Sequence, residues 1–456
     1  MFKILKFKNK FHSFALNEGK TSEKSNFFTI LIGNNGTGKS NILRDIIKFF
    51  VSIKLELDTD IKSIGTPKKI FALTNTQSDK FPYDKFEKFK KDPIKYNNSK
   101  YFYLGSKNSY GSNNRTYQLS RAIDIIISNF KSIKLFEKLN EVFKFLELQP
   151  IIKIDFNFTK NTLENIGKLK ELDLEDFYHY LDQNLDEDII DNQRILKNYR
   201  ELFNYIDRIN EKLEKNQNKI SLILNFSDKF IEKRLNIADM YVNLFAEYAV
   251  LHYLQERQIL KKKTIKIYNS NNAEFDFKEA SSGESNMLVQ LLPLCALLQD
   301  DSLIIIDEPE VSLHPLWQSK YLELLNKILI DSNGCHVFIA THSHLLLADI
   351  PIENSEVIIL RKDKNELRSK KIDYSTFGWS AENILLEVFK MPTTRNFYTA
   401  ELVSRALEIL AEPNNNINEL NIIKRQLNEI FPNLKNYDPL HFIISEILNE
   451  NNFRKN

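Results

Sequence analysis

The sequence predicts an α/β protein: a head built on a mixed sheet, interrupted by a mainly helical insertion and followed by a helical C-terminal region. Continuous apolar runs occur at Phe27–Ile32, Leu303–Ile306 and Val337–Ala340, as expected for parallel strands buried on both faces. Apolar residues at helical spacing follow the first two runs. Helical signals also dominate residues 119–260. These observations indicate β–α units around a buried sheet, with further helices inserted between them.

Other segments of the sequence have the pattern of strands. Phe2–Phe7 alternates enough to predict an edge strand, and residues 264–268 and 274–277 predict a hairpin. The remaining expected strands are Lys68–Leu73, Tyr101–Leu104, Ile152–Phe158 and Ile220–Leu224. In the insertion, Ile195 to Leu213 follows a short heptad spacing, which predicts a helical hairpin.

A glycine-rich loop joins the first apolar run to a helix. It fills every fixed position of the P-loop pattern G-x-x-x-x-G-K-S, in the strand–loop–helix context that the pattern requires. Glycines let backbone N–H groups converge on phosphate oxygens, Lys39 reaches the β- and γ-phosphates, and the Ser40 hydroxyl ligates Mg²⁺. The alternative, a chance glycine turn before a helix, does not account for all the fixed positions. The expected phosphate-binding residues are Gly33, Asn34, Asn35, Gly36, Thr37, Gly38, Lys39, Ser40 and Asn41.

Two acids directly follow the second apolar run. The carboxyl end of a buried parallel strand is where α/β sheets place ligands, so Asp307 is expected to hold Mg²⁺. Glu308 is expected to orient and deprotonate the attacking water, and Pro309 to keep Glu308 extended. The alternative is that both acids cap the next helix. That helix is expected to begin only near Pro315, which disfavours capping.

His342 follows the third apolar run. A lone histidine is usually structural. This one is expected at the same sheet edge as the P-loop and the acids, where its imidazole can contact a γ-phosphate.

Composition sets further limits. The chain has 456 residues and a net charge of +2, so any basic surface for nucleic acid must be local. Cys295 and Cys335 are the two cysteines, which excludes a disulfide framework or a cysteine-built zinc site and fits a reducing cytoplasm. Lysines interrupt the N-terminus, so it is no signal peptide, and the apolar stretch 287–298 is too short for a membrane span. Residues 79–100 interleave lysines with aromatic residues; a solvated loop is favoured over a nucleic-acid contact.

The order of four motifs carries a family resemblance. Gly33–Ser40, Ala280–Glu284, Leu303–Glu308 and Thr341–Ser343 occur in the order found in ABC-type ATPase heads. The divergent S-S-G-E signature and the tail D-E-P-E-V-S-L-H-P resemble the SMC/RecF/OLD branch more than transporter subunits. The resemblance implies an ATP hydrolase that uses ATP and Mg²⁺.

The resemblance also implies that a second copy of the head completes the nucleotide site. Heads of this kind pair, and Ser281, Ser282, Gly283 and Glu284 would bind the γ-phosphate of a nucleotide held by a second protomer. Gln77 is the candidate Q-loop residue, with a role in nucleotide and Mg²⁺ binding. Residues 312–314 match the D-loop, with His314 where transporters carry aspartate.

Domain organisation follows from the motif positions. The expected head is discontinuous, 1–118 and 262–380, with a mainly helical insertion at 119–261 and a C-terminal helical region at 381–456. The segment between Lys39 and Ser281 is longer than a compact head needs. In the SMC/RecF branch such an insertion becomes an arm or lever for DNA or for a partner.

The tail favours one biological role. Its F-G-W-S-A-E-N-I-L-L-E-V-F run resembles the ends of bacterial anti-phage defence ATPases, the PARIS- and Septu-like systems, which hold a nuclease subunit in check. The tail has no cluster of acids or paired histidines of its own, so the nuclease is expected to be a separate chain. A RecF-like DNA-repair ATPase is the main alternative. A soluble transporter subunit is disfavoured by the signature and the insertion.

Overall fold

The computed structural model describes most of the chain outside the large insertion. The described residues are 1–16, 25–51, 59–76, 79–82, 99–105, 115–129, 133–158, 211, 219–227, 251, 254–255, 260–350, 354–363, 366–372, 376–391, 395–411 and 416–449. They form two compact units, Met1–Gly378 and Trp379–Asn456. Gln77, the predicted heptad positions and most of the lysine- and aromatic-rich segment 79–100 lie outside the described residues.

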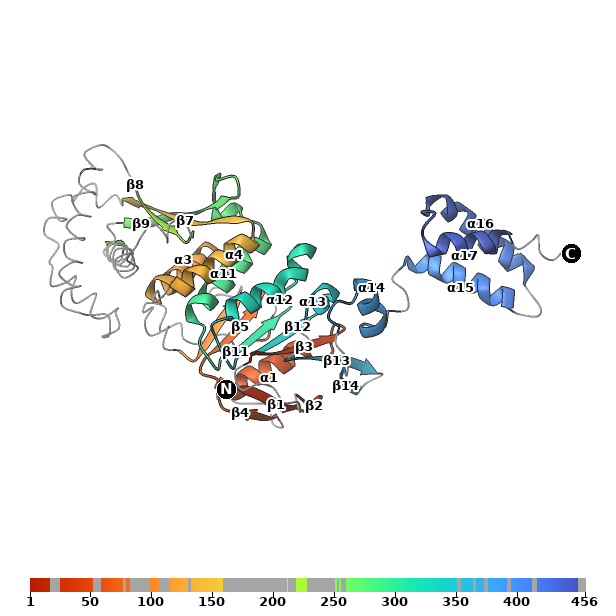
Figure 1. Cartoon of the computed structure of the whole chain (residues 1–456), viewed down its shortest axis with the longest axis horizontal. Coiled ribbons are helices and arrows are strands. Elements are labelled where there is room, and N and C mark those ends of the chain that lie inside the picture. Colours follow the sequence, from red (N-terminus) through yellow and green to blue (C-terminus); the bar gives the residue numbers. More distant parts are fainter. Residues whose placement is uncertain are drawn as a thin grey trace. The chain divides into compact units, whose positions relative to one another are not determined.

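Unit 1 is organised around one sheet of seven described strands (Figure 1). Its neighbouring strands run parallel except for the edge pair β13–β14, which is antiparallel. In spatial order the strands are β14 (Glu366–Lys371), β13 (Ser355–Asp363), β3 (Phe27–Gly33), β12 (His336–Thr341), β11 (Leu303–Asp307), β5 (Ile70–Thr74) and β6 (Tyr101–Gly105). The mixed α/β head predicted from the sequence is confirmed.

Every residue of β3, β11 and β12 is buried, because both faces of the sheet are covered. Side chains alternate between the faces along each strand, so Leu303 and Ile305 join one core cluster while Ile304 and Ile306 face the other side. On the first face the cluster includes α1 (Lys39–Val51), whose apolar stripe has the spacing expected of an amphipathic helix.

A second, three-stranded antiparallel sheet contributes to the same cluster. Its order is β2 (Ser13–Ala15), β1 (Lys3–Lys8) and β4 (Asp60–Ile64). The prediction that Phe2–Phe7 forms an edge strand is wrong, because β1 is paired on both sides. Strand β4 has no clear hydrophobic period, so the residue pattern predicts no second neighbour for β1.

Helices cover the other face of the main sheet (Figure 1). They are α3 (Arg115–Ser128), α4 (Ile133–Phe145), α11 (Ser282–Leu297), α12 (Pro315–Leu329) and the short α13 (His344–Ala348). Helix α11 packs against α3, α4 and strand β6, and nearly all its residues are buried, which explains its uniformly apolar sequence.

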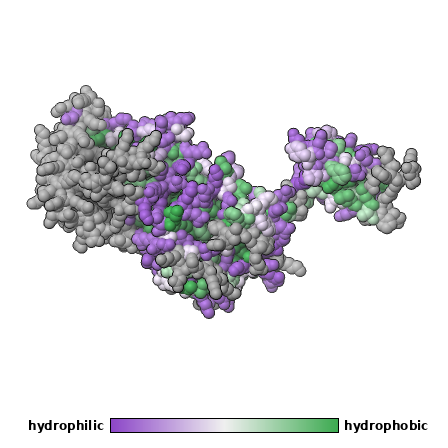
Figure 2. All heavy atoms as spheres, viewed as in Figure 1, coloured by the Kyte–Doolittle hydropathy of each residue, from purple (hydrophilic) through white to green (hydrophobic). Residues whose placement is uncertain are grey.

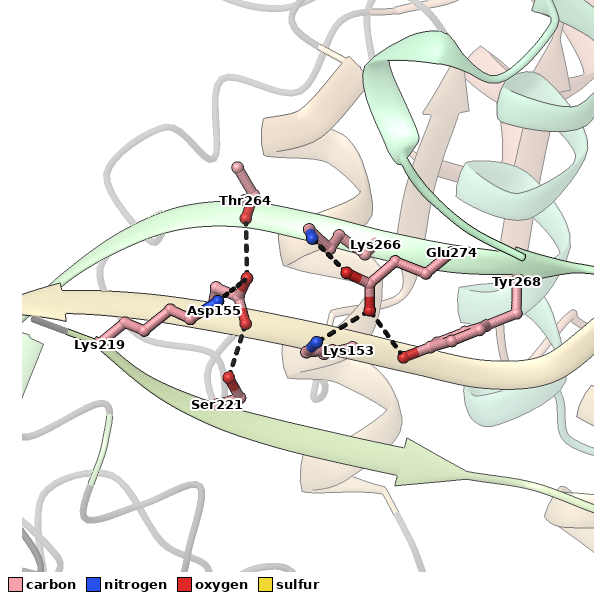
Figure 3. Close-up of polar contacts among 8 residues, drawn as sticks. All are labelled: Lys153, Asp155, Lys219, Ser221, Thr264, Lys266, Tyr268 and Glu274. Carbon is pink, nitrogen blue, oxygen red and sulfur yellow. Dashed lines mark hydrogen bonds and ion pairs between the residues drawn. The ribbon is translucent and has the colours of Figure 1, made fainter. Parts of the chain in front are cut away.

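A four-stranded antiparallel sheet precedes α11. Its order is β10 (Glu274–Asp276), β9 (Leu260–Asn269), β7 (Leu148–Phe158) and β8 (Lys219–Asn225), which confirms the predicted hairpin. Figure 3 shows its polar side chains. Lys153 and Lys266 both bond to Glu274 and lower the pKa of its carboxyl to about 2. Charges on three strands thus hold β10, which leads through the 3₁₀ turn Phe277–Glu279 into α11.

Unit 2 is helical and has its own core. It contains α14 (Ala381–Asn383), the π-helical turn Ile384–Val388, α15 (Phe397–Ala411), α16 (Ile417–Ile430), the 3₁₀ turn Phe431–Asn433 and α17 (Pro439–Asn449). Leucine, isoleucine and valine side chains of α15, α16 and α17 pack together. Figure 2 shows apolar residues on the visible surface of this unit, and Phe397, Tyr398, Tyr437 and Phe442 are among its exposed side chains.

His336 ties three strands of unit 1 together. Its ring is fully buried between Phe27 and Phe338. The Ile4 N–H donates to Nδ1 at 3.0 Å, so the ring proton lies on Nε2, which donates to the Thr29 hydroxyl at 2.9 Å. Burial holds the pKa of His336 well below its ordinary value, because a charged ring would be desolvated.

This lowered pKa predicts that unit 1 loses stability in mild acid. The unfolded chain protonates His336 near pH 6.5 and the folded chain does not, so its stabilisation is present above pH 6.5 and is lost as the pH falls. One such group contributes a slope of up to about 1.4 kcal/mol per pH unit. Urea unfolding between pH 8 and 5 should show this slope, and His336→Gln should flatten it. His441→Gln, in unit 2, is the control; an unchanged slope in His336→Gln would refute the assignment.

Candidate functional site

The P-loop adopts a conformation that its glycines make possible. Gly36 and Gly38 have φ of +78° and +92°, in the left-handed region that favours glycine. A side chain on Gly33 would lie 2.4 Å from the Leu360 carbonyl oxygen. The Thr37 hydroxyl donates to the Asn34 carbonyl at 2.8 Å and closes the turn. The loop is thereby held open to solvent at its tip, where residues 34–36 are exposed.

His12 braces this loop from the β1–β2 hairpin. Its Nε2 lies 2.8 Å from the Thr37 carbonyl oxygen, and its buried Nδ1 has no partner among the described residues. Since only Nε2 can donate to that carbonyl, the ring carries its proton there. The sequence pattern did not indicate His12, because the contact spans distant parts of the chain.

Lys39 lies between the P-loop and the end of β12. Its Nζ donates to the Gly33 carbonyl at 2.7 Å and to His342 Nε2 at 2.6 Å. Because Nε2 accepts, His342 is neutral, and the 3.6 Å approach of Glu308 to the same nitrogen is not an ion pair. Burial lowers the pKa of Lys39 to about 8, although Glu308 and other acids oppose the shift. Burial also lowers the pKa of His342.

Asp307 ends β11 beside the start of α1. Burial raises the pKa of its carboxyl to about 6; a hydrogen bond from Ser40 opposes this, and the Glu308 charge adds to it. Its Oδ1 is buried without a partner among the described residues. A buried carboxylate with an orphaned oxygen next to a serine hydroxyl fits a hydrated Mg²⁺, which takes one or two protein oxygens and completes its shell with water and phosphate. Ser40 and Asp307 are therefore the residues that would hold the metal.

The turn after β11 is strained. Glu308 has φ of +50° and Ser312 has φ of +67°, which cost about 1–3 kcal/mol each for residues other than glycine. The expectation that Pro309 keeps Glu308 extended is wrong. The Glu308 N–H still bonds to the Ala340 carbonyl at 2.8 Å, and its carbonyl accepts from Val311. The Glu308 N–H continues the pairing with β12, while its carbonyl begins the turn. The backbone of Glu308 takes the left-handed conformation because it makes both bonds.

Glu310 holds the backbone at the end of β12. Its Oε1 accepts the His342 N–H, and a side-chain hydrogen bond joins it to Thr341. Burial raises the pKa of its carboxyl, and Oε2 has no partner among the described residues. Glu310 thus links the turn that carries Glu308 to the strand that carries His342.

The signature segment is a helix cap. The Ser281 hydroxyl accepts the Glu284 N–H, and the Glu284 carboxylate accepts the Ser281 N–H, which is a capping box at the start of α11. The S-x-x-E pattern at residues 281–284 is the sequence signal for this cap, which adds a structural role to the expected phosphate contact. A side chain on Gly283 would lie 2.6 Å from the Ser312 carbonyl oxygen, so the D-loop packs on this helix end. His314 caps α12.

The structure brings together only part of the predicted site. Residues 33–40, Asp307, Glu308 and His342 meet at the carboxyl ends of β3, β11 and β12. Asn41 lies just inside α1, where its Oδ1 accepts from Lys80. In the described part of the chain, no hydrogen bond or ion pair joins residues 281–284 to the P-loop. Gln77 lies outside the described residues, so its role stays a prediction.

This arrangement defines a class of protein. A P-loop, an acid pair and a histidine lie at the ends of neighbouring parallel strands in this mixed sheet, and together they define the head of a P-loop ATPase.

A sequence model of one family matches residues 28–349, and the chain belongs to that family, described as "AAA domain, putative AbiEii toxin, Type IV TA system".

Two curated relatives match shorter stretches. Protein ea59 of Escherichia phage lambda is 28% identical over 158 residues, which cover 34% of this chain and 29% of that protein. The Septu protein PtuA of Bacillus thuringiensis is 27% identical over 165 residues, which cover 32% of this chain and 40% of that protein. The chain therefore matches less than half the length of each relative.

Similar solved structures overlap only loosely. One is an SMC head domain from Pyrococcus furiosus bound to the C-terminal domain of ScpA. The match covers 82% of this chain and 96% of the SMC chain, with 12% sequence identity and a TM-score of 0.32. The match to the recombination mediator protein RecF covers 81% of this chain and 98% of the RecF chain, with 13% sequence identity and a TM-score of 0.27. Across the described residues, no helix combines the length and apolar character needed to cross a membrane.

The contacts of Lys39 predict that it is required for nucleotide affinity. Lys39→Ala removes the cation that would face the phosphates, and ATP binding should weaken by about 100-fold or more, as for the loss of a desolvated charge contact. Binding of a fluorescent ATP analogue measures this. Lys48→Ala, in the last turn of the same helix, should bind like wild type. Equal affinity in Lys39→Ala and wild type would show that this loop does not bind nucleotide.

Proposed function

We propose that the chain is a Mg²⁺-dependent ATPase in which two heads pair around ATP and control a separate partner chain. The observation that carries the catalytic part is the meeting of Lys39, Asp307, Glu308 and His342 at one sheet edge. Buried Cys295 and Cys335 are free thiols, in keeping with action in the reducing cytoplasm.

Each side chain has a defined task in this proposal. Lys39 moves its hydrogen bonds from Gly33 and His342 to the phosphates, and His342 can then take up a proton at Nε2 and donate it in a hydrogen bond to the γ-phosphate. Ser40 and Asp307 would hold Mg²⁺, whose charge would neutralise the phosphates. Glu308 stands within reach of His342 and accepts a proton from the attacking water.

Pairing of heads follows from the signature segment. Ser282 lies at the first position of α11 and is half-buried, while Ser281 and Glu284 bond to one another. Within one chain these residues have no described polar contact with the P-loop. They gain a role if the P-loop of a second chain faces them, as in the family resemblance, and a two-fold axis then creates two identical composite sites.

Subunit mixing tests the pairing. Lys39→Ala leaves the signature intact, and Ser282→Arg leaves the P-loop intact but places a bulky cation where the second nucleotide would lie. Each variant alone should be inactive. Mixing them should restore about a quarter of the wild-type rate, because half of the dimers would contain one complete site.

The control for mixing is a chain that carries both substitutions. Mixed with Lys39→Ala, it should restore nothing. Ser282→Arg alone should still bind ATP through its own P-loop. Full turnover by Ser282→Arg alone, or no recovery in a freely exchanging mixture, would contradict composite sites.

We propose further that the partner is a nuclease chain of an anti-phage defence complex. The match to a Septu protein and the family description as part of a toxin–antitoxin system support a role with other components. The tail sequence supports the same assignment, and unit 2 presents exposed apolar residues that a partner could cover. The proposed division of labour places ATP handling in the head at 1–118 and 262–380, and partner choice in residues 119–261 and 381–456.

Deletion of unit 2 tests partner choice. Removing Trp379–Asn456 should leave ATP binding unchanged, since unit 1 has its own core, and should abolish co-purification with the protein encoded by the neighbouring gene. Phe397→Ser combined with Phe442→Ser should weaken the complex without unfolding the unit, because both side chains are exposed. Ser445→Ala, also in α17, is the control. A complex retained after the deletion would move the partner site to residues 119–261.

A further inference from the structure

Two buried amides join α11 to the turn that carries Glu308. Gln290 of α11 donates through Nε2 to the Thr74 carbonyl at 2.9 Å and to Asn75 Oδ1 at 2.7 Å. Asn75 donates through Nδ2 to the Pro309 carbonyl at 2.9 Å and to the Val311 carbonyl at 3.1 Å. Gln290 and Asn75 are 4% and 9% exposed, so these bonds are not exchanged for water.

The geometry uses the full donor capacity of both amides. Each side-chain nitrogen carries two hydrogens, and each hydrogen has its own acceptor. Rotation of the Asn75 amide would break contacts on both sides at once, because its oxygen faces Gln290 and its nitrogen faces the turn. The two side chains therefore form a stiff link between α11 and the turn.

The link contacts the strained part of the turn. Pro309 and Val311 lie between the two left-handed residues Glu308 and Ser312, and such backbone persists only where surrounding contacts fix it. Asn75 supplies two of those contacts. The turn is also touched by the first turn of α11, where Gly283 packs on the Ser312 carbonyl. Helix α11 therefore contacts the turn at Gly283 and, through Asn75, at Gln290, two points about two helical turns apart.

We propose that Asn75 and Gln290 are positioning residues that transmit the position of α11 to Glu308. When a second head's nucleotide engages the start of α11, the shift reaches the Glu308 turn through Gln290 and Asn75 and sets the carboxylate for proton abstraction. This relay rests on the proposed function and adds to it the regulation of the base. Pro293, three residues beyond Gln290, has no N–H to donate to the preceding turn, so α11 lacks one backbone hydrogen bond next to the segment that carries the signature and Gln290.

The relay predicts a split between binding and turnover. Asn75→Ala and Gln290→Ala should each lower kcat by about tenfold or more, because a displaced general base loses part of its contribution to the rate. The Kd for ATP should change by less than about threefold. The double variant should lose little more than either single variant, since each breaks the same chain of bonds. Asn326→Asp, an exposed amide-to-acid change on α12, should match wild type.

The experiment measures ATP hydrolysis and ATP affinity of the full-length chain well below its melting temperature. If the alanine variants are insoluble, Gln290→Met keeps a side chain of similar length, removes both donors without adding a charge and should show the same split. The relay is overturned if kcat stays within about twofold of wild type, if Kd rises by as large a factor as kcat falls, or if the two losses multiply in the double variant. A wild-type chain that binds but never hydrolyses ATP, even when paired, overturns the proposed function itself.

Discussion

Burial of opposite charges at one sheet edge is the constraint on which the site depends. Lys39 and Asp307 are buried and Glu310 is half-buried, and burial shifts the pKa of each in the direction that favours its neutral form. A magnesium–nucleotide complex would reverse both shifts, because phosphate stabilises the charged lysine and the cation stabilises the carboxylate. In the proposed function, this gain would help to replace the Lys39–His342 hydrogen bond when the complex binds.

The same edge explains why distant motifs must fold together. β3, β12, β11 and β5 are neighbours in space but are separated by long stretches of sequence, including the insertion. Glu310 connects β11 to β12, and Asn75 connects β5 to the turn after β11. In each connection a polar side chain pairs with a backbone N–H or carbonyl group beyond the end of a strand. Loss of one should therefore disturb catalysis before it disturbs the fold.

The sequence predicted the elements with strong local signals. Strands buried on both faces, the P-loop and the acid pair depend on residues that lie close together in the chain, and each was found where expected. The failures involve long-range partners. Strand β4 has no clear period, so β1 was expected at an edge, and the backbone of Glu308 depends on Ala340 and Val311 rather than on Pro309 alone. His12, Asn75 and Gln290 act through single contacts that no local pattern reveals.

The central claim is that Glu308 is the base of a site that closes only between two heads. Glu308→Gln keeps the shape and both Mg²⁺-binding residues but removes the base, so hydrolysis should fall by about 10²–10⁴-fold. Light scattering with ATP should then show a persistent dimer that retains unhydrolysed nucleotide, whereas wild type returns to monomer as ATP is consumed. Hydrolysis at the wild-type rate, or trapped ATP on a monomer, would contradict the account.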